Sequence, residues 1–132
     1  MRKSTNRSLK AKAWKLFSEY IRRSYSDRHD NATCYTCGAT GHWKSLQAGH
    51  AIPGRTNAVL LDEDVVRPQC VACNIYRRGN YPVFVNNLIK EHSTEWFDRK
   101  LADARRAVKY TKADWMRFIE IYKGKIQALE VL

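Results

Sequence analysis

The sequence predicts an α+β fold in which an irregular central segment lies between helical ends. Apolar residues recur at steps of three and four near both termini, which is the period of amphipathic helices, but not in the centre. Four of the six glycines fall within residues 34–73 and interrupt that segment repeatedly. The length of 132 residues fits one domain, 1–132, and neither an internal repeat nor a linker is evident.

Both ends of the chain are predicted to be helical. Residues 8–26 should form a basic N-terminal helix with Ser8 as its N-cap, because Lys and Arg interleave with the apolar stripe. The tail, residues 93–132, should hold two helices, over 94–108 and 112–130. Their expected start signals are Ser93 and a capping box of Thr111 with Asp114.

The central segment, residues 33–92, is predicted to contain short strands and two helices. Strands are expected within 43–51 and at 59–61. The first helix should run from Cys70 to Arg78, and Gly79 suits the left-handed position that follows it. The second should begin with Pro82 and end near His92.

The charge of the chain points to a polyanionic partner. Lys and Arg total 24 against 13 Asp and Glu, so the net charge is +11 and the pI about 9.8. Residues 1–30 hold nine of the basic and three of the acidic residues, whereas residues 31–69 hold three of each. DNA is the expected partner, and a solvated cationic surface without a specific partner is the alternative.

No membrane partner is expected, because no run approaches the roughly 20 apolar residues that span a bilayer. The N-terminus is basic but lacks the apolar stretch of a signal peptide. A cytoplasmic location and reduced thiols are therefore expected.

All four cysteines fall into two CxxC pairs, which predicts one structural zinc ion per chain. Two such turns can close a tetrahedron of thiolates and leave no open position for a substrate. A redox dithiol pair and an iron–sulfur cluster are the alternatives, and the first lacks the βαβ context of redox motifs. The expected zinc ligands are Cys34, Cys37, Cys70 and Cys73.

Between and after these pairs the sequence becomes similar to a known superfamily. A Gly49–His50 pair followed by Ile52–Pro53, and a Cys-x-x-Cys-Asn segment with basic residues beyond it, resemble the HNH, or ββα-metal (His-Me finger), nucleases. The QAGH and QCxxCNxxxxGN segments are similar to the NinG/Rap recombination endonucleases of lambdoid phages. The layout is also similar to phage endonuclease VII, a Holliday-junction resolvase. The resemblance covers residues 33–92 and implies a zinc-stapled ββα-metal core.

The resemblance also implies catalytic roles. His50 matches the general base, and Asn74 matches a ligand of a catalytic Mg²⁺ or Mn²⁺. Gly49 stands where the superfamily commonly has a metal-binding Asp, and the middle Asn of the HNH pattern would fall near Val65. The candidates for the missing oxygen ligand are Asp62, Glu63, Asp64 and Gln47.

Basic residues near the centre and on the first helix are the expected DNA contacts. Arg67 has a second interpretation as a structural ion-pair partner. The predicted phosphate contacts are Arg55, Arg67, Arg77, Arg78, Lys12, Lys15, Arg22 and Arg23.

These features together predict a metal-dependent DNA endonuclease. The resemblance implies branched recombination intermediates, such as Holliday junctions or D-loops, as its substrates. A homodimer would follow, because two symmetric cuts need two active sites, and the Trp- and Tyr-rich tail could supply the interface. One alternative is a non-catalytic zinc-dependent DNA-binding protein. A zinc protein that binds RNA is another, but it would not explain a His between the two cysteine pairs.

Overall fold

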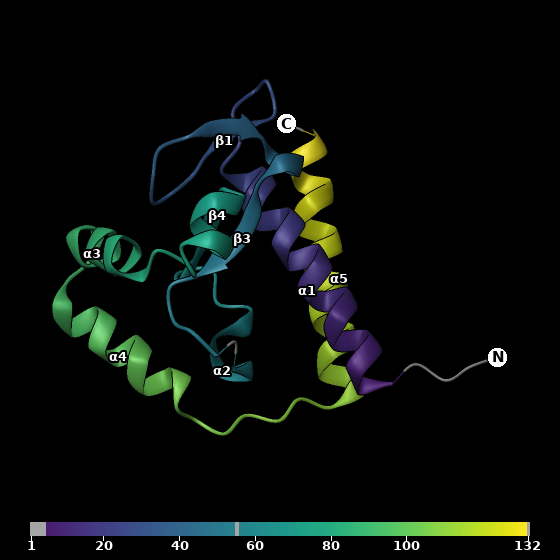
Figure 1. Ribbon diagram of the computed structural model, residues 1–132. Coiled ribbons are helices and arrows are strands. Elements are labelled where there is room, and N and C mark those ends of the chain that lie inside the picture. The colour runs from purple at the N-terminus through teal and green to yellow at the C-terminus, as the bar shows by residue number, and fades with distance from the viewer. Residues whose placement is uncertain (1–4, 55, 132) are drawn as a thin grey trace.

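The computed structural model describes residues 5–54 and 56–131 and has the predicted α+β composition (Figure 1). Two long helices stand side by side at one edge of the molecule. Two shorter helices lie at the other edge, and two small sheets lie between them.

The two long helices are α1 (Asn6–Ser24) and α5 (Lys112–Val131), and they run in parallel (Figure 1). The Phe17 and Tyr122 rings meet edge to face at 5.1 Å near the middle of the pair. The aromatic face of the tail is therefore buried against α1 of the same chain, although sequence reasoning had offered it as a dimer interface.

Capping residues explain where these helices begin. The N-cap of α1 is Thr5, whose hydroxyl accepts from the backbone N–H of Ser8 at 3.1 Å. The prediction of Ser8 as N-cap is therefore wrong, because Ser8 is the third helical residue of that capping box. The box predicted for α5 is confirmed, since Thr111 and Asp114 exchange bonds of 2.9 and 3.2 Å.

The central sheet consists of β3 (Gln47–His50) and β4 (Val66–Gln69), paired antiparallel with His50 opposite Val66. Ala48 and Val66 pack into the apolar cluster beneath α1 and α5. Strand β3 lies within the range 43–51 where strands are predicted, and the 3₁₀ turn η1 (Trp43–Ser45) occupies the beginning of that range.

The strand predicted at 59–61 is wrong, because the short helix α2 (Asn57–Leu60) lies there instead. Val59 and Leu60 are both buried, but in two different apolar clusters. A helical turn can direct adjacent side chains into these two clusters, whereas short apolar runs look alike in helices and strands at the sequence level.

The second sheet is a hairpin of β1 (Asn31–Thr33) and β2 (Thr40–His42). Its connecting loop contains Cys34 and Cys37. The other two cysteines lie around the start of η2 (Ala72–Tyr76), a π-helical turn in the middle of the predicted 70–78 helix. Gly79 has a φ of 90°, as predicted.

At the other edge, α3 (Tyr81–Glu91) and α4 (Thr94–Ala104) enclose a core around Phe84, Leu88 and Phe97. The Ser93 cap is confirmed by a 3.0 Å bond from the Trp96 N–H. Helix α4 ends at Ala104, four residues earlier than predicted. The Ala104 carbonyl accepts from the hydroxyl of Thr56 at 3.0 Å, and the chain then crosses to α5 (Figure 1).

None of the helices in the described part of the chain has both the length and the apolar character needed to span a membrane.

Candidate metal centre and neighbouring cleft

The two cysteine pairs come together in space. The four sulfur atoms of Cys34, Cys37, Cys70 and Cys73 all lie within 4.8 Å of one another. The Cys37 and Cys70 sulfurs are 3.6 Å apart, and all four thiols are free. Sulfurs bound at about 2.3 Å to one tetrahedral zinc ion would lie about 3.8 Å apart. The cluster could therefore hold a structural metal such as zinc.

Local backbone geometry produces this cluster. The first pair lies in a tight turn in which the Gly38 N–H donates to the Cys34 carbonyl at 3.0 Å, with Gly38 at a φ of 82°. In the second pair the Cys73 N–H points at the Cys70 sulfur, 3.4 Å away. Each CxxC turn therefore has hydrogen bonds of its own, and the Tyr35 N–H also joins the first turn to the Pro68 carbonyl of β4 at 2.9 Å.

The thiols influence one another's ionisation. Burial opposes ionisation of Cys34, but hydrogen bonds from Thr36 and from neighbouring backbone N–H groups outweigh it and lower the pKa to about 6. The Cys37 thiol has a backbone bond that lowers its pKa, but burial and bonds to the other three sulfurs raise it to about 12. Four thiolates at this spacing repel one another, and a divalent cation would remove that repulsion.

Two residues beyond the second pair contact its last sulfur. The guanidinium of Arg77 donates to the Cys73 Sγ at 3.5 Å, and the Asn80 amide donates to the same sulfur at 3.8 Å. The bond to Cys73 raises the pKa of Arg77. Arg77, predicted as a phosphate contact, thus lies beside the cysteine cluster, while Arg78 is exposed at a φ of 51°.

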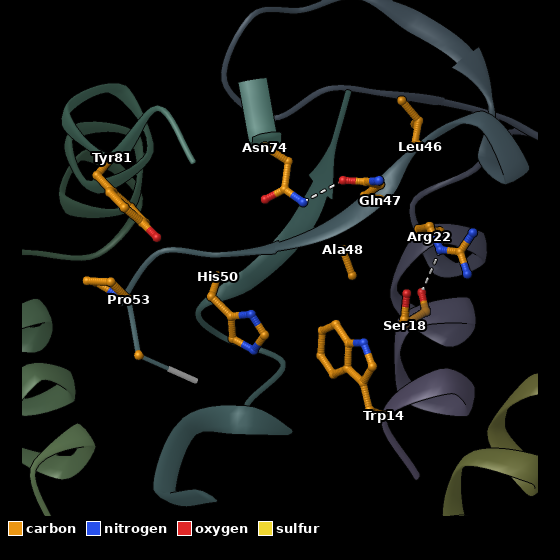
Figure 2. Close-up of a pocket in the computed structure, with 11 residues that line it drawn as sticks. Trp14, Ser18, Arg22, Leu46, Gln47, Ala48, His50, Pro53, Asn74 and Tyr81 are labelled. Atoms are coloured by element: carbon orange, nitrogen blue, oxygen red, sulfur yellow. Dashed lines mark hydrogen bonds between the residues drawn. The ribbon is translucent and has the colours of Figure 1, made fainter. Parts of the chain in front are cut away.

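A cleft of about 420 Å³ lies next to this centre and holds both predicted catalytic residues (Figure 2). His50 is 8% exposed at the end of β3. Its Nε2 lies 3.1 Å from the Leu60 carbonyl, and its ring stacks on Trp14 of α1 at 4.9 Å. Because a carbonyl only accepts, Nε2 carries the hydrogen, and the lone pair of a neutral ring is on Nδ1.

Asn74 lies on the opposite wall of the cleft, in η2. Its amide Nδ2 donates to Gln47 Oε1 at 2.7 Å, and Figure 2 shows its oxygen turned away from Gln47. Arg22 adds a positive charge from α1, and burial lowers its pKa. Helix α1, strand β3, η2 and α3 therefore meet around one opening, to which Tyr81 contributes from α3.

The acidic candidates are not brought together with Asn74. Asp62 and Asp64 form ion pairs with Lys100 at 2.9 and 3.0 Å. Glu63 pairs with Lys125 at 2.6 Å. All three carboxylates line a different cleft. Gln47 does lie beside Asn74, but its oxygen accepts the Asn74 amide hydrogen bond.

Arg67 matches the structural interpretation rather than the phosphate contact. It is 7% exposed, and its guanidinium donates to the carbonyls of Glu63 and Asp64 at 2.8 and 3.0 Å and pairs with Glu91 at 3.5 Å. A residue that binds DNA phosphate must have an accessible guanidinium, whereas the guanidinium of Arg67 is buried and bound to these partners. We therefore do not retain Arg67 among the DNA contacts.

Three of the remaining predicted DNA contacts are residues of α1. Lys12 and Lys15 are exposed on α1, whereas Arg23 is engaged with Glu19 and Glu130 at 3.2 and 3.0 Å. Arg55 lies outside the described residues.

Sequence reasoning missed two residues of this region. Trp14, which lies on α1, forms a wall of the cleft against His50. Gln69 is fully buried, and its amide oxygen lies next to Gly49. Its place in the QCxxCN segment was the only available indication, because nothing in a sequence pattern reports a side-chain contact across two strands.

Fold and site together define a small basic α+β protein in which a four-cysteine centre abuts a cleft containing a buried histidine. The family described as Bacteriophage Lambda NinG protein matches residues 2–131, and the chain belongs to this family. No curated protein and no solved structure shows a significant match.

Proposed function

We propose that the protein is a metal-dependent DNA endonuclease that hydrolyses phosphodiester bonds. The observation that carries this proposal is the meeting of His50 and Asn74 at one cleft, with Asn74 directly after the last cysteine of the metal centre. Membership in the NinG family supports a phage recombination-related role. The chain order of β3, β4 and η2 supports the resemblance to ββα-metal nucleases.

In this proposal the cysteine centre binds zinc and has a structural role. Two of its ligands flank the start of η2, and the other two lie in the β1–β2 loop. A zinc ion there would hold η2, and with it Asn74, at a fixed position beside β3.

His50 is the proposed general base. The bond from Nε2 to Leu60 and the stacking on Trp14 fix the ring and its tautomer. His50 would accept a proton at Nδ1 from the water that attacks phosphorus. The 3′ oxygen leaves, so hydrolysis yields a 5′-phosphate and a 3′-hydroxyl end.

Asn74 is the proposed ligand of the catalytic cation. A divalent cation such as Mg²⁺ or Mn²⁺ would neutralise charge on the phosphate and on the leaving oxygen. An amide oxygen is a suitable ligand for such a hard ion. Arg22, on the α1 wall, would bind the same phosphodiester backbone.

Branched recombination intermediates are the proposed substrates, cut by a homodimer with one active site per strand. The net charge of +11 and the exposed Lys12 and Lys15 support binding to the DNA backbone rather than to base edges.

The test compares wild type, His50→Ala and the control His42→Ala, whose histidine is exposed on β2. Each protein is given a labelled four-way junction or a matched duplex with Mg²⁺, Mn²⁺ or EDTA. We expect metal-dependent cutting by wild type and His42→Ala, and a loss of about 10²-fold or more in His50→Ala with binding unchanged. Cutting by His50→Ala at the wild-type rate would refute the role of His50.

One observation favours a second function, a non-catalytic zinc-dependent DNA-binding protein. None of the described residues that line the cleft has a carboxylate. Under this alternative, wild type and His50→Ala would bind DNA equally and neither would cut it with any metal.

A further inference from the structure

One buried polar atom stands out beside the cleft. Gln69, the last residue of β4, is fully buried, and its Oε1 has no hydrogen-bond partner. Within residues 5–54 and 56–131 no other buried side-chain nitrogen or oxygen atom lacks a hydrogen-bond partner. An unsatisfied buried amide oxygen costs free energy, so its presence requires an explanation.

The orientation of this amide is fixed by its other end. Gln69 Nε2 donates to the Gly79 carbonyl at 2.9 Å and to the Thr36 hydroxyl at 3.1 Å. Turning the amide over would place its oxygen against the Gly79 carbonyl, and two acceptors would then face each other. Oε1 is therefore held on the opposite side, against Gly49 of the neighbouring strand.

Gly49 leaves the space that this oxygen occupies. A Cβ at position 49 would overlap Gln69 Oε1 and would lie 3.1 Å from Asn74 Oδ1. The amide oxygens of Gln69 and Asn74 therefore border one point, the place where a side chain of residue 49 would begin. Residue 49 is a glycine because the Gln69 side chain occupies the space that a larger side chain at this position would need.

The Asn74 amide is oriented as well. Its Nδ2 donates to Gln47 Oε1 at 2.7 Å (Figure 2). This leaves Oδ1 on the side of Gly49. Gln47 thus acts as a positioning residue for Asn74. Two oriented amide oxygens, one from β4 and one from η2, therefore lie on the same side of Gly49, and Asn74 also lines the His50 cleft.

We propose that Gln69 Oε1 and Asn74 Oδ1 are the two protein ligands of a hard divalent cation, Mg²⁺ or Mn²⁺. Carbonyl oxygens, like carboxylates and water, are suitable ligands for these hard ions. Mg²⁺ keeps several waters and uses few protein ligands, so water and substrate phosphate would complete its shell. The inference rests on the proposed function and deepens it, because Gln69 supplies the oxygen ligand that Gly49 does not.

The first experiment measures Mn²⁺ binding by electron paramagnetic resonance on the full chain with its zinc content verified. Wild type should bind one Mn²⁺. Gln69→Met and Asn74→Ala should each weaken binding at least about tenfold, the scale for losing even an outer partner of a metal. The matched control Gln127→Met changes an exposed glutamine on α5 and should bind as wild type. Equal binding by wild type and Gln69→Met would overturn the proposal.

A compensating pair guards against simple misfolding. Gly49→Asp alone should clash with Gln69 and lose Mn²⁺ binding together with thermal stability. Combining it with Gln69→Ala empties the space and delivers a carboxylate to the same point, so this double variant should bind Mn²⁺ at least as tightly as wild type. If the double variant folds but binds no more tightly than Gln69→Ala alone, the proposal fails.

DNA cleavage separates this inference from the proposed function. Mn²⁺ binding that depends on Gln69 and Asn74 without any cleavage would support the cation site and refute the nuclease. The opposite result is metal-dependent cleavage by wild type together with equal Mn²⁺ binding by wild type and Gln69→Met. That result would support the nuclease and refute Gln69 as a ligand. Gln69 would then be a buried structural side chain that is held only by Gly79 and Thr36.

Discussion

The cysteine centre and the His50 cleft are neighbours around η2, but they are built in different ways. The centre uses four identical side chains in two short turns, and each turn arranges its own backbone donors. The cleft takes single side chains from α1, β3, η2 and α3, among them ordinary core residues such as Trp14. The comparison teaches that each half of a four-sulfur site can be encoded by a short local turn, whereas every wall of this cleft depends on the packing of distant elements.

The largest effect is expected when one sulfur of the cysteine centre is removed. Cys73→Ser should abolish metal retention and destabilise the protein by about 10 kcal/mol, the scale of structural zinc binding, so the cleft would be lost with it. Zinc content and thermal unfolding followed by circular dichroism would measure this. Ala39→Ser, an exposed change in the first cysteine turn, is the control. A folded Cys73→Ser protein with an intact cleft would show that the two regions are independent.

An intermediate effect is expected at Arg67, on the strand β4 that precedes the second cysteine pair. Arg67→Ala leaves the carbonyls of Glu63 and Asp64 without their donor and Glu91 without its partner. We expect a loss of about 2 kcal/mol, mainly because two carbonyls lose a charged donor. The ion pair with the half-exposed Glu91 adds little. The salt dependence of DNA binding should not change. A salt slope that falls by about one would instead identify Arg67 as a phosphate contact.

The smallest effect is expected at Trp14, which touches the cleft but not the cysteine centre. Trp14→Ala should destabilise the protein by about 2 kcal/mol, less than a fully buried Trp, and loosen the ring of His50. Trp14→Phe keeps an aromatic face and should lose less than about 1 kcal/mol. Melting temperature and cleavage rate are the measurements, and zinc content should stay at the wild-type value in both variants. Zinc loss in Trp14→Ala would contradict the separation.

Local patterns were sufficient for much of the fold. The helical period predicted α1 and α5, and the start signals Pro82 and Ser93 predicted α3 and α4. The caps Ser93 and Thr111 could be identified because a cap acts within four residues. Where distant contacts compete, the prediction failed. Helix α4 ends at Ala104, whose carbonyl accepts from Thr56, 48 positions away, and a contact at that distance leaves no local pattern. The apolar run at 57–60 is a helix because its side chains are shared between two clusters.

For the site, the sequence by itself determined the four cysteines, because CxxC spacing constrains two sulfurs through the backbone between them. It also placed His50 and Asn74 in one region by resemblance. Only the tertiary structure decided that the acidic residues 62–64 pair with lysines, that Arg67 is buried, and that Gln69 fills the space beside Gly49. The physical reason is that ion pairs and buried amides depend on which strands and helices meet, and the spacing of residues along a chain does not contain that information.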